Sequence, residues 1–103
     1  MSVWYDYPTP YGTYRVTIDV SRYANGRTAL VLMDEQGETV AIATVNLPNE
    51  DLGIGEMFIK TWSENATMLQ FLVANGIVED TGRTVPTGFV RASIVRALWW
   101  ECA

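Results

Sequence analysis

Alternating hydrophobic and polar residues define the first element that the chain predicts. Over residues 13–20, apolar side chains occupy every second position, which is the period of a strand with one buried face. Asn25-Gly26 follows and favours a tight turn, and residues 28–34 are apolar on both faces, as in a central strand. Residues 40–45 show the same two-faced pattern. The first half of the chain therefore predicts a meander of three antiparallel strands.

The second half predicts one helix. Residues 57–62 form a short strand-like run, after which Ser63 has the side chain of a helix N-cap. Apolar residues then recur at helical spacing as far as Asn75-Gly76, where glycine can adopt the left-handed conformation that ends a helix. We expect a helix over residues 63–75.

The end of the chain predicts a turn and a last strand. Residues 81–88 are rich in Thr, Gly and Pro and read as a turn, and residues 89–98 read as a strand. Together the elements predict an α+β fold, in which an antiparallel β-sheet of about five strands carries the helix packed on one face. The length of 103 residues suits a single domain spanning residues 1–103.

Composition narrows the setting of this domain. Hydrophobic residues make up 49% and charged residues 18% of the chain, enough apolar material for a packed core. The apolar runs are far shorter than the ~20 residues that cross a bilayer, and the amino terminus lacks a secretory pattern. We expect a cytoplasmic protein with no membrane contact. Cys102 stands alone, so it forms no internal disulfide and is either a spectator or a reactive thiol.

The inventory of reactive side chains argues against most enzyme classes. The sequence contains no histidine, which excludes Ser-His-Asp and Cys-His arrangements. Four acids, Glu50, Asp51, Glu56 and Glu64, lie near one another in sequence. They could hold a metal ion or simply solvate a loop, and they lack the spacing of a calcium-binding loop. We expect no catalytic residue, no metal and no cofactor.

Other side chains suggest contact with a partner. Trp99 and Trp100 belong to a concentration of aromatic residues at the two chain ends, which either close the core or form a contact surface. Phe71, with Met68, is either packed or part of a patch that a partner covers. Arg83 is either a loop organiser or an interface arginine. The candidate partner-binding residues are Glu50, Asp51, Glu56, Glu64, Phe71, Arg83, Trp99 and Trp100.

The acidic balance of the chain bears on the kind of partner. Twelve acidic and seven basic residues give a net charge of −5, which opposes direct binding to nucleic acid. The charge serves solubility, or it directs part of the surface to a basic partner, such as a surface that normally binds nucleic acid. We expect a protein partner of this kind, with the chain itself a monomer or a homodimer.

Several segments resemble a known family. TVNLP, FIKTWSEN, ASIVRAL and above all GIVEDTGRTVPTGFV are similar to a bacterial family of about this length, known only as a domain of unknown function. The resemblance covers residues 11–98 and implies an origin on plasmids, phages and integrative elements. It gives no activity and no catalytic residues that could be transferred to this sequence.

That genetic setting suggests a function. From it we expect a non-enzymatic binding protein that inhibits a host defence nuclease complex, of the anti-CRISPR or anti-restriction type, by protein–protein contact. The alternative is a structural or homodimeric accessory module of a mobile element with no inhibitory role.

Overall fold

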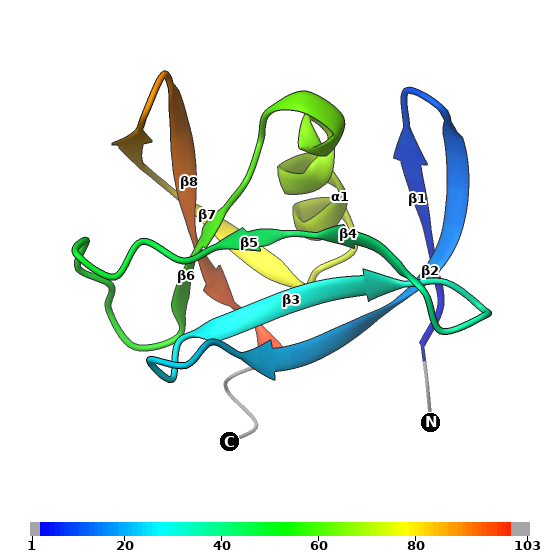
Figure 1. The fold of residues 1–103 in the computed structure, drawn as a ribbon, viewed down its shortest axis with the longest axis horizontal. Coiled ribbons are helices and arrows are strands. Elements are labelled where there is room, and N and C mark those ends of the chain that lie inside the picture. The colour runs from blue at the N-terminus through cyan, green and yellow to red at the C-terminus, as the bar shows by residue number, and fades with distance from the viewer. Residues whose placement is uncertain (1–2, 100–103) are drawn as a thin grey trace.

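The computed structural model describes residues 3–99, and it arranges them in two four-stranded antiparallel sheets and one α-helix (Figure 1). One sheet has the strand order β1-β2-β3-β4 and the other the order β5-β6-β8-β7. The elements in chain order are β1 Tyr5–Thr9, β2 Gly12–Arg22, β3 Thr28–Met33, β4 Thr39–Ile42, β5 Thr44–Val45, β6 Glu56–Ile59, the 3-10 turn η1 Ser63–Asn65, α1 Met68–Ala74, β7 Val78–Thr87 and β8 Val90–Ala97.

The expected α+β fold is confirmed in outline, but the single sheet of about five strands is wrong. The predicted meander exists as β2, β3 and β4. The run at 40–45 is divided at Ala43, whose N–H donates to the Leu30 carbonyl in the first sheet (2.9 Å). The Ala43 carbonyl accepts from the Lys60 N–H beside the second sheet (2.9 Å). The chain therefore crosses from the first sheet to the second at Ala43.

The helix is shorter than expected and starts later. Ser63 is not its N-cap, because Ser63 lies in the left-handed region (φ 54°) at the start of η1. The cap position of α1 is Thr67, whose hydroxyl donates instead to the Pro8 carbonyl (2.7 Å) and ties the helix to β1. The predicted stop is correct. Gly76 has φ 69°, and the N–H of Ile77 returns to the Leu72 carbonyl (3.0 Å), which is a Schellman closure.

The region expected to be a turn is a strand. Residues 81–88 are mostly part of β7, which pairs with β8 along its length apart from a bulge between Asp80 and Thr84. Gly82 lies in the bulge with φ 81°, and Pro86 is tolerated because β7 is an edge strand. The last strand begins at Val90, so Phe89 lies in the hairpin turn.

The main core lies between the two sheets and α1. Phe71 belongs to it: the side chain is 4% exposed, and its ring packs edge-on against Tyr5 and Tyr7, with centroids 6.1 and 5.0 Å apart. Of the two alternatives for Phe71, packed or part of a patch that a partner covers, the structure shows the packed one. No helix in the described part of the chain is long and apolar enough to span a membrane.

Candidate functional site

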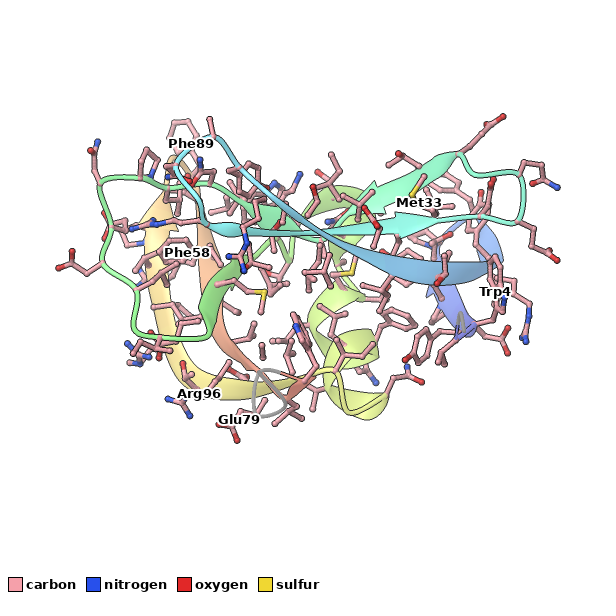
Figure 2. All side chains as sticks on the ribbon, turned by 90° about the horizontal axis from the view of Figure 1, so that it is seen from below. Trp4, Met33, Phe58, Glu79, Phe89 and Arg96 are labelled. Atoms are coloured by element: carbon pink, nitrogen blue, oxygen red, sulfur yellow. The ribbon has the colours of Figure 1, made fainter. Side chains whose placement is uncertain are left out.

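The loop over residues 46–55, here called the acidic loop, joins β5 to β6 and covers the outer face of the second sheet. Under it lies a small second core around Phe58, which is 1% exposed, with Ala92 and Ile94 from β8 (Figure 2). Leu47 and Leu52 of the loop pack against this cluster. Their burial gives the loop an apolar underside, which holds it on the sheet.

Arg27, next to the β2–β3 turn, clamps the acidic loop from the side. Its Nη1 donates to the Leu47 carbonyl and its Nη2 to the Glu50 carbonyl, each at 2.6 Å. The guanidinium also lies 5.9 Å from the centre of the Phe58 ring, within the range of a cation–π contact. One side chain thus joins the loop backbone to the small core beneath it.

Glu56, at the start of β6, holds the other end of the loop. Its carboxylate side chain is 6% exposed and forms ion pairs with Arg83 of β7 and Arg96 of β8. The carboxylate also accepts the Gly53 N–H (2.8 Å), which closes the end of the loop. Arg96 pairs in turn with Glu79 (Figure 2). The Glu56 carboxylate is therefore bound by groups of the protein itself. Arg83 organises this network while its side chain stays half exposed.

Replacing Glu56 by glutamine should lower the free energy of unfolding by about 1–2 kcal/mol. The amide can still accept the Gly53 N–H, but the charge between Arg83 and Arg96 is lost. Urea denaturation measures the effect. Glu79→Gln is the matched control, since Glu79 also pairs with Arg96 but has a side chain that is 49% exposed. This substitution should lower the free energy of unfolding by less than about 0.5 kcal/mol. Equal losses for the two variants would contradict a central role for Glu56.

The side chains that the acidic loop exposes to solvent are not the groups that hold the loop on the protein. The side chain of Asp51 is exposed, and Ile54 is 87% exposed. Glu50 is half buried, and its backbone holds the loop through the Arg27 bond and a bond from its N–H to the Leu47 carbonyl (3.0 Å). The loop therefore presents the Asp51 carboxylate and the large apolar side chain of Ile54 on a backbone that is anchored at both ends.

The other predicted contact residues, Trp99, Trp100 and Glu64, do not belong to the acidic loop. Trp99 is half buried and packs against the main core, in line with core closure. Trp100 and the side chain of Glu64 lie outside the described residues. Within the described part of the chain, no three carboxylates or other metal-binding side chains lie close enough to hold a metal ion.

Sequence reasoning missed three residues of this end of the molecule. Arg27 carried no signal, since an arginine after a turn is ordinarily solvated. Ile54 did carry one, as an isolated apolar residue between two glycines in a polar loop. Phe89, assigned to a strand, is fully exposed in the β7–β8 turn (Figure 2).

Comparison with known proteins adds a family to this geometry. A family model described as Domain of unknown function (DUF4313) matches residues 17–96, which include the acidic loop, the Glu56 network and most of both sheets. No curated protein and no solved structure matches the chain. Since the model covers most of the sequence, the chain belongs to the DUF4313 family, a domain of unknown function.

Proposed function

We propose that the chain is a non-enzymatic, cytoplasmic binding protein of mobile genetic elements that inhibits a host defence nuclease complex by protein–protein contact through the acidic loop. The observation that carries the proposal is the exposure of Ile54, 87%, on a loop whose backbone is held by Arg27 and Glu56. When a partner covers a large apolar side chain at such a position, the apolar surface leaves water, and this favours binding.

Rigidity supports a binding role for the loop. Ordering a mobile side chain or loop at an interface costs about 0.5–1.5 kcal/mol per side chain, which a prearranged loop avoids. The Arg27 bonds, the Gly53 bond to Glu56 and the packed Leu47 and Leu52 provide this prearrangement. Covering Ile54 in a partner's pocket would contribute roughly 1.5–3 kcal/mol.

Charge supports a basic partner. The chain carries a net charge of −5, and Asp51 is an exposed carboxylate in the same loop as Ile54, three residues before it. A nuclease that binds nucleic acid presents a basic surface to the phosphates. An acidic protein is drawn to such a surface by the same field, and occupying it blocks the substrate.

The test uses purified RNA-guided nuclease complexes and restriction enzymes as candidate targets. Binding is measured by biolayer interferometry and inhibition by DNA cleavage at increasing concentrations of the protein. We expect at least one nuclease to be bound and inhibited. Ile54→Ser should weaken that binding by about 10-fold or more, and Asp51→Lys should slow association by about 10-fold, with a weaker dependence on salt.

Asp19→Lys provides the matched control. Asp19 is an exposed carboxylate on β2, so the variant changes the net charge as Asp51→Lys does but leaves the loop intact. It should bind nearly as the unchanged protein does. The proposal fails if no nuclease is bound, or if Ile54→Ser binds like the control. A homodimer dissociated by Ile54→Ser, without nuclease binding, would support the accessory-module alternative.

A further inference from the structure

A groove lies on the first sheet, away from the acidic loop. The β1–β2 hairpin projects from the body of the protein, opposite the side where the acidic loop lies (Figure 1). Between this hairpin and the β3–β4 hairpin is an open groove of about 440 Å³. Its lining includes Tyr7, Thr9, Tyr11, Tyr14, Asp34 and Val40.

The register of the hairpin places the tyrosines on its inner face. Tyr7 pairs with Tyr14 across the two strands, so their side chains lie on the same face. Asp6 pairs with Arg15 and occupies the opposite face, where the two form an ion pair at 3.3 Å. The hairpin is thus aromatic toward the groove and charged away from it.

Exposure increases along this aromatic face from the core outward. Tyr7 is 1% exposed and packs on the main core, whereas Tyr14 is 42% and Tyr11 84% exposed. The hydroxyls of Tyr11 and Tyr14 make no hydrogen bond within residues 3–99. Two tyrosine rings with free hydroxyls therefore stand in water above a packed base.

Asp34 adds a negative charge to the groove. Its Oδ1 accepts the N–H groups of Gln36 and Glu38, each at 2.9 Å, which holds the β3–β4 turn in place. Across the described range, Asp34 forms no ion pair and no lysine or arginine lines the groove. Glu35 and Glu38 are exposed in the same turn and add to the negative field. The groove thus combines aromatic faces with an uncompensated carboxylate.

We propose that this groove binds an extended segment of a partner protein that places an arginine or lysine side chain between Tyr11, Tyr14 and Asp34. A cation is attracted to tyrosine ring faces and pairs with the carboxylate by charge-assisted hydrogen bonds. The free tyrosine hydroxyls can donate to carbonyl groups of the segment. Charge complementarity selects this occupant, because Asp34 is the one charged residue in the groove lining of the described chain, and a neutral segment would leave its charge without a counter-ion.

This inference goes beyond the function proposed for the acidic loop and does not depend on it. The groove belongs to the first sheet, whereas the acidic loop covers the second. A partner could engage either surface alone.

The test is a titration of the intact protein, observed by two-dimensional NMR of its backbone amides. The probes are a short proline–alanine peptide with one central arginine and the same peptide with citrulline, which has nearly the same shape without the charge. The arginine peptide should shift amide signals of Tyr11, Tyr14, Asp34 and Val40. The citrulline peptide should bind about 10-fold more weakly, as expected for loss of a charged pair.

Three variants locate the binding site on the protein. Asp34→Asn keeps an oxygen that accepts the turn N–H groups, so the fold is retained, and should weaken arginine-peptide binding by about 5- to 10-fold. Tyr11→Ala, at an exposed position, should weaken it by about 3-fold or more. Glu35→Gln is the control, because it removes the same charge from the same turn outside the groove lining, and it should have less than half the effect of Asp34→Asn.

Four results would overturn the proposal. The first is an absence of shifts in the groove signals at millimolar peptide. The second is equal binding of the arginine and citrulline peptides, and the third is an Asp34→Asn effect no larger than that of Glu35→Gln. The fourth is displacement of the same signals by a single-stranded oligonucleotide but by neither peptide, which would assign the groove to a different class of ligand.

Discussion

Phe71→Ala is expected to lower the free energy of unfolding by about 3–5 kcal/mol, the cost of removing a buried aromatic ring and leaving a cavity. The ring is 4% exposed and fills the space between α1 and the aromatic pair Tyr5 and Tyr7. Because small domains are stable by only about 5–15 kcal/mol, much of the total would be lost. Urea denaturation followed by tryptophan fluorescence measures the change.

Two further variants keep this prediction testable if Phe71→Ala does not fold. Phe71→Leu retains most of the volume and should cost about 1.5 kcal/mol or less. Val73→Ala changes the same helix at a side chain that is 42% exposed and should stay within about 0.5 kcal/mol of the unchanged protein. If both Phe71 variants kept full stability and lost only partner binding, Phe71 would be a surface residue after all.

Arg27→Met should lower the free energy of unfolding by about 2–3 kcal/mol and release the acidic loop. The substitution keeps the aliphatic part of the side chain but removes both bonds to the Leu47 and Glu50 carbonyls and the cation–π contact with Phe58. Those carbonyls are partly buried, so water replaces the lost donors incompletely. Urea denaturation gives the stability, and amide hydrogen exchange of residues 46–55 reports the release of the loop.

Arg91→Met separates this effect from the loss of any arginine. Arg91 is exposed on β8, and among the residues described its side chain forms hydrogen bonds only to Thr84. Its replacement should therefore lower the free energy of unfolding by about 0.5 kcal/mol or less and leave the amide hydrogen exchange of the acidic loop unchanged. Unchanged loop exchange in Arg27→Met would show that the loop does not need the clamp.

Elements with a strong local pattern were predictable from the sequence. β2, the turn at Asn25-Gly26 and β3 follow from alternation and turn chemistry that act within a few residues. The helix stop at Gly76 is equally local. Its start was missed because Thr67 uses its hydroxyl on Pro8, 59 residues away, rather than on the helix. β7 was missed because Gly82 and Pro86 are turn residues that an edge strand with a bulge also accepts.

The candidate site was predictable only in part. The acidic character of residues 46–56 was visible, but Asp51 and Glu56 are alike in sequence. Glu56 is enclosed between two arginines from distant strands, whereas Asp51 faces solvent. Arg27 and Phe58, which hold the loop in place, could not be connected to it by any pattern.

Local physical chemistry in the chain is enough to specify an α+β fold, most of its strand segments and the lack of a histidine-based active site. Long-range packing selects the rest: the division of the strands into two sheets at Ala43, the burial of Phe71, and the loop that carries Ile54 outward. The reason is that a periodic pattern reports which residues avoid water, whereas the identity of their partners depends on contacts between segments far apart in the chain.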